Sequence, residues 1–282
     1  MAVSAETRSM AVFCDFENVA LGVREAKYDK FDIDKVLERL LVKGSILVKR
    51  AYCDWGRYKE FKASMHEAAF ELIDIPHVRQ AGKNSADIRM VVDALDLCYT
   101  KAHVDTFVIV SGDSDFSALV SKLRENNKEV IGVGVKKSTS DLLIANCDEF
   151  IYYDDLVREE KAKAKRGRRR PARPKPAVAK AAPEGEEVEA EDRAQEAVDL
   201  VLETLEALVA ERGESEKIWG SMIKQALKRR KPGFNESYYG FKSFTDVLEE
   251  AKTRGLLDLE HDEKSGGYLV RAASPAAAEL AD

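Results

Sequence analysis

The sequence is poor in the residues that build disulfide frameworks, zinc sites and nucleophilic catalytic pairs. It contains four cysteines and four histidines in 282 residues. The cysteines are Cys14, Cys53, Cys98 and Cys147. No two of them form a C-x-x-C pair, and each lies in an apolar run where a thiol packs as a small hydrophobe. Zinc sites need paired spacing with histidines nearby, so we expect no structural zinc. No Ser/His or Cys/His pair suggests covalent catalysis, and scattered thiols fit a reducing cytosol.

Long hydrophobic runs and a general excess of positive charge are also absent. No apolar run approaches the roughly 18 residues of a membrane span, and no basic start precedes an early apolar stretch. We therefore expect a soluble, cytoplasmic protein. A net charge of −6 argues against a uniformly basic nucleic-acid binder. That charge is uneven, because residues 157–192 carry 11 basic and 8 acidic side chains while the flanking parts are acidic.

Residues 1–156 alternate short apolar or β-branched runs with amphipathic stretches. Strands are expected at residues 10–14, 45–52, 72–78, 106–110, 130–135 and 150–153. Helices are expected at residues 33–42, 58–70, 86–99 and 116–126. This alternation predicts an α/β fold whose doubly wound, mostly parallel sheet is covered by helices on both faces. In such sheets ligands collect at the carboxyl ends of the strands, where the strand order reverses.

A sharp change of composition separates this part from the C-terminal third. Residues 161–180 hold ten Lys or Arg and no acid, and residues 184–192 hold six acids and no base. With few apolar side chains to bury, residues 157–192 are predicted to form a disordered linker, basic and then acidic. Residues 193–272 then show three helical patterns and two short apolar runs joined across Ser265-Gly266-Gly267. They predict a small winged helix, followed by a tail at 273–282.

Aspartates directly follow two of the expected strands. Asp15 precedes Phe16-Glu17-Asn18, and Asp113 follows Val110-Ser111-Gly112. If these strands are parallel neighbours, both carboxylates emerge at the same sheet edge, and Asp87, at the start of a helix, can join them. Carboxylates this close raise each other's pKa, a cost that Mg²⁺ or Mn²⁺ removes because both prefer oxygen ligands. The pattern therefore points to phosphodiester hydrolysis by metal-activated water.

The residues alone leave other interpretations of these positions open. An aspartate after a strand is commonly a helix cap or turn residue, and Asp115 is as readily a cap as a ligand. Asn18 can orient a water or a phosphate, or cap the next helix. Asp93, six residues beyond Asp87, lies about 240° further around the helix and is left out of the site. The residues alone therefore predict an acidic metal site and do not identify its substrate.

Three motifs of this part resemble those of the NYN family, the LabA-like branch of the PIN-like nucleases. They are residues 12–18 (VFCDFEN), 83–95 (KNSADIRMVVDAL) and 111–116 (SGDSDF), which occur in the family's order within residues 10–155. The resemblance implies a doubly wound fold, Mg²⁺ or Mn²⁺ as cofactor, and ribonuclease activity, with endonucleolytic cleavage expected. The resemblance implies that Asp15, Asp87 and Asp113 bind the metal and act in catalysis. It implies supporting catalytic roles for Asp115 and Asn18.

The C-terminal part resembles an OST-HTH (LOTUS) domain, a winged helix that often accompanies NYN domains. The residues that carry this resemblance are 231–244 (KPGFNESYYGFKSF), followed by Leu256-Leu257. It implies RNA binding or protein docking, with the aromatic residues expected in the core. The candidate RNA contacts are Lys228, Arg229, Arg230 and Lys231 before that segment, and Arg168, Arg169 and Arg170 in the linker. A solvated helix end and a solubilising spacer are the alternative interpretations.

Two functions of different class remain. The first is a metal-dependent endoribonuclease whose C-terminal part recruits or positions RNA. The second is a non-catalytic RNA-binding or adaptor protein that keeps the NYN fold. A small-molecule phosphatase shares the acids but leaves the basic linker without a role. We expect RNA as a partner, proteins as further partners of the C-terminal part, and no membrane.

Overall fold

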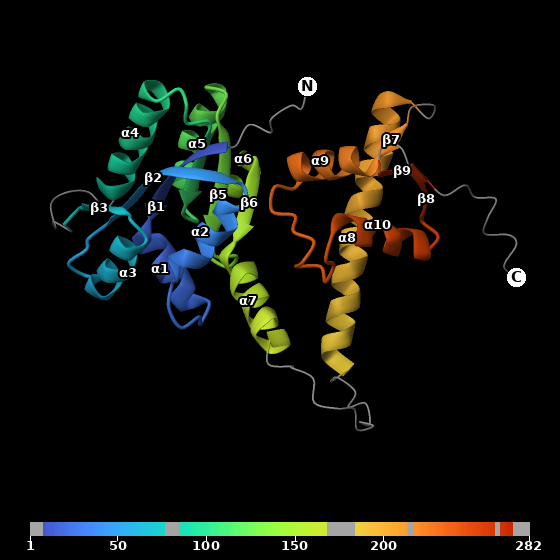
Figure 1. Ribbon diagram of the computed structural model, residues 1–282, viewed down its shortest axis with the longest axis horizontal. Coiled ribbons are helices and arrows are strands. Elements are labelled where there is room, and N and C mark those ends of the chain that lie inside the picture. The colour runs from blue at the N-terminus through green and yellow to red at the C-terminus, as the bar shows by residue number, and fades with distance from the viewer. Residues whose placement is uncertain (1–7, 77–84, 168–183, 214–216, 263–265, 273–282) are drawn as a thin grey trace, which may run out of the picture. The chain divides into compact units, whose positions relative to one another are not determined.

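The computed structural model describes residues 8–76, 85–167, 184–213, 217–262 and 266–272. The chain divides into two units, Met1–Lys163 and Ala164–Asp282, whose elements are labelled in Figure 1. None of the described helices is long and apolar enough to cross a membrane.

A six-stranded, all-parallel sheet forms the centre of the N-terminal unit. Its strands are β1 (Arg8–Asp15), β2 (Gly44–Cys53), β3 (Glu71–Asp74), β4 (Thr106–Val110), β5 (Glu129–Gly134) and β6 (Glu149–Tyr152). Their order is β3-β2-β1-β4-β5-β6, so the direction of winding reverses between β1 and β4. In the register of these two strands Cys14 lies opposite Val110, which brings the residues that follow each strand to the same edge. All six expected strands are present.

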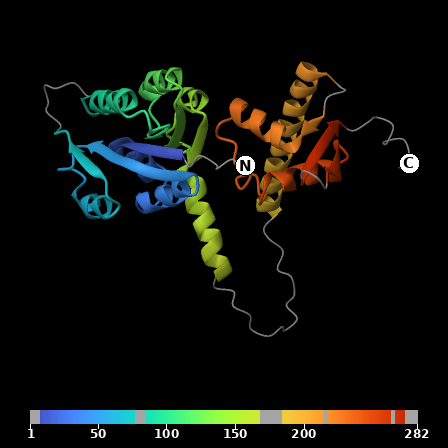
Figure 2. The ribbon, with the colours of Figure 1, turned by 45° about the horizontal axis from the view of Figure 1, so that its top comes forward.

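Helices cover both faces of this sheet (Figures 1 and 2). One face packs against α1 (Phe16–Glu25), α2 (Ile33–Leu41), α3 (Lys62–Glu67) and α7 (Tyr153–Gly167), the other against α4 (Ser85–Thr100), α5 (Ser117–Glu125) and α6 (Asp141–Asn146). Along β1 the side chains alternate between the faces, with Val12 and Cys14 in one core cluster and Ala11 and Phe13 in the other. Burial on both faces makes the strands continuous apolar runs, and the predicted α/β fold with a parallel sheet is confirmed.

Three helices of this unit, α1, α6 and α7, were not among those predicted. Helix α1 begins at Phe16, directly after β1, and Asp15 is its N-cap. No polar loop separates strand from helix, so the sequence shows one apolar run passing into another. Helix α6 has only six residues, fewer than two turns, which is too short for a helical period to be recognised.

The C-terminal unit combines helices with a small antiparallel sheet. Its elements are α8 (Glu184–Arg212), β7 (Ile218–Trp219), α9 (Gly220–Arg230), α10 (Phe244–Thr253), β8 (Leu257–Asp262) and β9 (Gly267–Ala272). The three helices and the hairpin were expected. A further short strand, Ile218–Trp219, pairs with Val270 and Leu269 of β9, and α9 begins directly after it at Gly220. Ser243 and Asp246 form a reciprocal capping box at the start of α10.

Within residues 157–192, which are predicted to form a disordered linker, the structure describes helix at both ends. Helix α7 continues to Gly167, and α8 begins at Glu184. Alanine, lysine, arginine and glutamate are strong helix formers, and composition alone hid this propensity. Residues 168–183, with Arg168, Arg169 and Arg170, lie outside the described residues, as does the tail at 273–282.

Candidate functional site

Asp15 is a buried carboxylate at the point where the strand order reverses. It is the last residue of β1 and only 7% exposed. Its Oδ1 accepts the backbone N–H of Asn18 at 3.4 Å, which caps α1, and its Oδ2 accepts the hydroxyl of Ser111 at 3.0 Å. The sequence fixes this position because an apolar strand runs directly into a helix that needs an acceptor at its start.

Ser111 links Asp15 to the second strand-end aspartate. It follows β4 and is fully buried, and its Oγ accepts the backbone N–H of Asp113 at 3.2 Å while it donates to Asp15. Asp113 in turn accepts the N–H of Asp115 at 3.0 Å and caps the short 3-10 helix η2 (Ser114–Phe116). One hydroxyl therefore holds the two aspartates in a fixed relation across neighbouring strands.

Asn18 fastens the loop that carries Asp113. Its Oδ1 accepts the backbone N–H of Gly112 at 2.9 Å. Gly112 is required here, because a Cβ at that position would lie 2.5 Å from the carbonyl oxygen of Ser138. The carbonyl of Gly112 accepts the N–H of Ser140 at 2.9 Å, so the loops after β4 and β5 and helix α1 meet at this glycine. The amide of Asn18 is thus a structural tie between α1 and the loop after β4.

The acidic residues of this edge share one electrostatic environment. Burial raises the pKa of Asp15 to about 7, the charges of Asp87 and Asp113 add to that rise, and the hydrogen bonds from Ser111 and Asn18 oppose it. Asp87, half-buried in the first turn of α4, has a raised pKa because of burial and the charges of Asp113, Asp115 and Glu17. Both ionised groups lie in a field that favours bound protons or a cation.

The oxygen atoms of these carboxylates are ligands that a hard divalent cation prefers, but the side chains do not form a complete set of metal ligands. Within the part of the chain that the structure describes, no three His, Cys, Asp or Glu side chains form a group that could hold a metal ion as they stand. Mg²⁺ is commonly bound through one or two carboxylates and keeps several waters, so a loosely spaced, all-oxygen donor set fits it. The ligand roles of Asp15, Asp87 and Asp113 stay predictions.

Two residues of this site were absent from the sequence-based prediction. Ser111 joins the two aspartates, and its one signal in the sequence is a hydroxyl directly after a buried strand. Glu17 raises the pKa of Asp87 and pairs with Arg57 at 3.2 Å. Its signal is an acid in the first turn of a helix that was itself not predicted. Asp93, left out of the site, accepts hydrogen bonds from Tyr52 and Arg89.

The candidate RNA contacts of the C-terminal unit divide into different roles. Arg230 donates to the carbonyl of Glu203 at 3.2 Å and to the hydroxyl of Thr204 at 3.3 Å, so it ties α9 to α8. Arg229 and Lys231 are exposed at the end of α9, and Lys228 is partly exposed. The aromatic residues of the following segment pack inward, as expected: Phe234 is buried and stacks with Tyr239.

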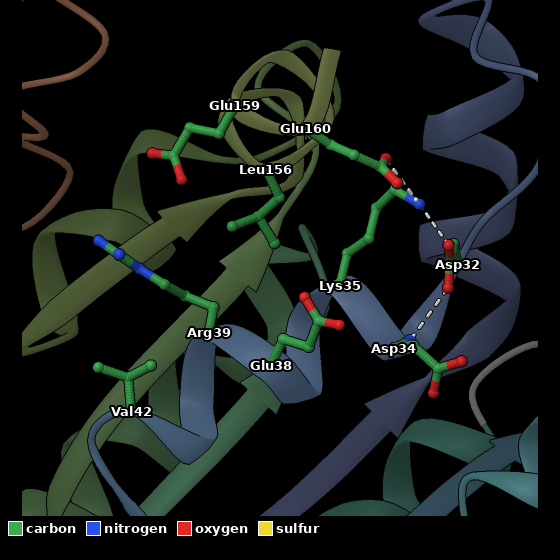
Figure 3. A pocket seen from close by; sticks show the side chains of 9 residues that line it. All are labelled: Asp32, Asp34, Lys35, Glu38, Arg39, Val42, Leu156, Glu159 and Glu160. Carbon is green, nitrogen blue, oxygen red and sulfur yellow. Dashed lines mark hydrogen bonds and ion pairs between the residues drawn. The ribbon is translucent and has the colours of Figure 1, made fainter. Parts of the chain in front are cut away.

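A surface hollow between α2 and α7 is separate from the acidic site (Figure 3). Its volume is about 410 Å³, and Lys35 bridges Asp32 and Glu160 on its wall, the latter at 3.0 Å. Most of its lining is charged and exposed to solvent. The hollow contains no residue predicted for the site: its lining is Asp32, Asp34, Lys35, Glu38, Arg39, Val42, Leu156, Glu159 and Glu160.

Comparison with known proteins identifies the N-terminal unit. The model of the NYN domain matches residues 9–154 and ends before the C-terminal unit. The uncharacterized protein MJ0482 of Methanocaldococcus jannaschii is 29% identical over 140 residues, which cover 49% of this chain and 55% of that protein. The chain thus spans about half the length of this curated relative. A protein of unknown function from Vibrio parahaemolyticus, VPA0982, is similar at 28% identity, covering 54% of this chain and 97% of that one with a TM-score of 0.48.

Proposed function

The chain belongs to the NYN domain family, and on that premise we propose that it is a metal-dependent ribonuclease that cleaves RNA phosphodiesters endonucleolytically. NYN domains are typically ribonucleases and usually use a metal ion. The observation that carries the proposal is Asp15: a buried carboxylate whose pKa is raised to about 7 beside two further aspartates. Such a group costs the fold stability, and a divalent cation offsets that cost.

In this proposal Asp15, Asp87 and Asp113 hold Mg²⁺ or Mn²⁺. The ion, when bound, would lower the pKa of a water and neutralise the charge that develops on the phosphodiester. Ser111 fixes the orientation of Asp15 through its hydrogen bond to Oδ2. Asn18 keeps the loop of Asp113 in place through Gly112. Asp115, exposed in the 3-10 helix that Asp113 caps, would accept a hydrogen bond from the attacking water and take its proton.

The C-terminal unit is proposed to recruit or position RNA as a winged helix of the OST-HTH type. The support is its three helices with a two-stranded hairpin and the exposed basic end of α9. The linker between the units adds sequence-independent attraction to phosphates through its Lys and Arg residues. Docking of a protein partner on this unit is the second role that the same elements suit.

The test is an RNA-cleavage assay with the full chain and labelled single-stranded and structured RNAs. Cleavage in Mn²⁺ that is lost in EDTA and in Asp113→Asn supports the proposal. The matched control is Asp96→Asn, an exposed aspartate of α4 away from the acidic edge, which should cleave like wild type. Equal cleavage by Asp113→Asn and wild type would contradict the proposal and point to a contaminating nuclease.

A non-catalytic RNA-binding protein is the competing function. The observation that favours it is that the acidic side chains of the described residues do not stand as an assembled ligand group. It requires RNA binding without cleavage in either metal, and loss of that binding when residues 157–282 are deleted. Binding of Mn²⁺ by the N-terminal unit, measured by titration calorimetry at millimolar metal, separates the two because only the nuclease needs it.

A further inference from the structure

Two exposed cations flank the acidic centre along the carboxyl edge of the sheet. Arg57 lies in the loop after β2, and Lys137 lies in the loop after β5. The strand order places β1 and β4, which carry Asp15 and Asp113, between those two strands. The edge therefore runs from a positive charge through a cluster of negative charges to a second positive charge.

Arg57 is held on the β2 side of the acids by two loop contacts and an ion pair. Its backbone N–H bonds to the carbonyl of Asp54 at 3.0 Å, and the N–H of Trp55 bonds to Asp74 at 2.9 Å. Its guanidinium pairs with Glu17 at 3.2 Å, and the Arg57 side chain is 54% exposed. Glu17 is one of the charges that reach Asp87. The guanidinium thus borders the acids and remains open to a ligand.

Lys137 is held on the β5 side by the loop that packs on Gly112. The N–H of Ser138 bonds to the carbonyl of Val135 at 3.1 Å, and the N–H of Ser140 bonds to the carbonyl of Gly112 at 2.9 Å. Gly112 immediately precedes Asp113. Lys137 projects from this loop as an exposed residue, so its charge lies beside the loop of Asp113.

The distance between these two loops is too long for one phosphate group to contact both, and it fits several consecutive phosphates of a nucleic-acid strand. From β2 to β5 there are three strand spacings of about 4.8 Å, or roughly 14 Å in all. Successive phosphates of a stacked strand rise by about 3.4 Å along the helix axis and lie further apart along the backbone, so this distance spans about two to four nucleotides. A centre of several aspartates repels a phosphate, and a cation on each side offsets that repulsion where the strand enters and leaves.

We propose that Arg57 and Lys137 bind backbone phosphates on opposite sides of the scissile one, so that a single RNA strand crosses the carboxyl edge from β2 to β5. This proposal rests on the proposed ribonuclease function and adds to it the path and the class of the substrate. The substrate is a polymer with charged phosphates on both sides of the cut. Mononucleotides and terminal phosphates make only one of the two contacts and are poor substrates.

The experiment removes single charges from the substrate and from the full chain together. The cleavage position in a short single-stranded RNA is mapped in Mn²⁺, and each neighbouring phosphate is replaced, on a 2′-deoxy residue, by an uncharged methylphosphonate. The same oligonucleotide with a charged 2′-deoxy phosphate is the reference. In wild type, neutralising a phosphate that a cation contacts should raise KM about 5-fold with little change in kcat. In Arg57→Ala that penalty disappears on one side of the cut, and in Lys137→Ala on the other.

Matched variants keep the result specific. Lys101→Ala removes an exposed lysine between α4 and β4, at the opposite edge of the sheet, and should keep both penalties. Arg57→Lys retains a cation, so neutralising the phosphate on the Arg57 side should still raise KM by most of the wild-type factor. If both alanine variants show the wild-type penalties, the proposed path is wrong while the ribonuclease function stands. If wild type cleaves no RNA, the proposed function and this path fail together.

Discussion

The hydroxyl of Ser111 donates a hydrogen bond across 3.0 Å to Oδ2 of Asp15, which ends the neighbouring strand. Oγ of Ser111 also accepts the N–H of Asp113 at 3.2 Å, and no part of Ser111 is exposed. A buried hydroxyl with two strong partners contributes to stability and also fixes the two aspartates relative to each other. Removing it affects both the fold and the site.

We expect Ser111→Ala to destabilise the N-terminal unit by about 1 to 3 kcal/mol, because the carboxylate of Asp15 and the N–H of Asp113 both lose a partner in a buried place. It should also weaken Mn²⁺ binding, since the hydrogen bond from Ser111 lowers the pKa of Asp15. Urea unfolding in EDTA measures the first effect, and calorimetric titration with Mn²⁺ measures the second.

Ser117 supplies the control for that substitution. It is also buried, but its hydroxyl makes no hydrogen bond within the described part of the chain. Ser117→Ala should therefore be neutral or slightly stabilising and leave Mn²⁺ binding unchanged. A loss of stability in Ser117→Ala equal to that in Ser111→Ala would show that serine burial, rather than the link to Asp15, explains the effect.

Asp15→Asn is expected to stabilise the metal-free protein at pH 8. The folded-state pKa of Asp15, about 7, lies above its ordinary value of 3.8. Above pH 7 the ionised carboxylate therefore destabilises the fold, by roughly 4 kcal/mol at most. As the pH falls from 7 towards 3.8, the folded protein takes up a proton that the unfolded chain does not bind, and wild type regains that stability.

Unfolding in EDTA at several pH values checks this sign. The advantage of Asp15→Asn should be largest near pH 8 and shrink steadily towards pH 4. Asparagine remains a good N-cap for α1, so loss of the cap does not obscure the comparison. Millimolar Mn²⁺ should stabilise wild type and not the variant. A variant that is less stable than wild type at pH 8 in EDTA would contradict the assigned burial cost.

The sequence sufficed for the sheet because β1 and β4 are buried on both faces and therefore read as unbroken apolar runs. It also sufficed to bring Asp15 and Asp113 to one edge, because each directly follows such a run. Asp87 depended on the family resemblance, since nothing in its own helix points towards those strands. The sequence therefore predicts the position of an acid best where that acid follows a buried strand.

What the sequence could not supply are contacts that depend on register and on loop packing. The hydrogen bond from Ser111 to Asp15 needs the alignment of Cys14 with Val110. The bond from Gly112 to Asn18 needs α1 to begin without a loop after Asp15. The same limit applies to residues 157–192, because a composition typical of disorder is also one of strong helix formers.

Gly112→Ala should damage the site through steric pressure on its loops. The added Cβ would lie 2.5 Å from the carbonyl oxygen of Ser138 and 3.0 Å from Cα of Thr139, both backbone atoms that cannot rotate away. We expect a loss of about 1 to 3 kcal/mol in stability and reduced cleavage, because Asp113 follows directly. Gly56→Ala is the control, since its Cβ would approach only the carboxylate of Asp54. Denaturation and cleavage rates measured for both variants give the comparison, which fails if the two behave alike.

We expect the two arginines at the end of α9 to have different roles, one structural and one in ligand binding. Arg230 bonds to Glu203 and Thr204 of α8, so Arg230→Ala should lower the stability of the C-terminal unit by about 1 kcal/mol. Arg229 is exposed on the same turn, so Arg229→Ala should leave stability unchanged. If this end contacts RNA, Arg229→Ala should also weaken binding and reduce the slope of log affinity against log salt by about 0.7 for a single strand. Hydrogen exchange of α8 and anisotropy titrations at several salt concentrations distinguish the two roles, and an unchanged salt slope in Arg229→Ala would remove this helix end from the RNA interface.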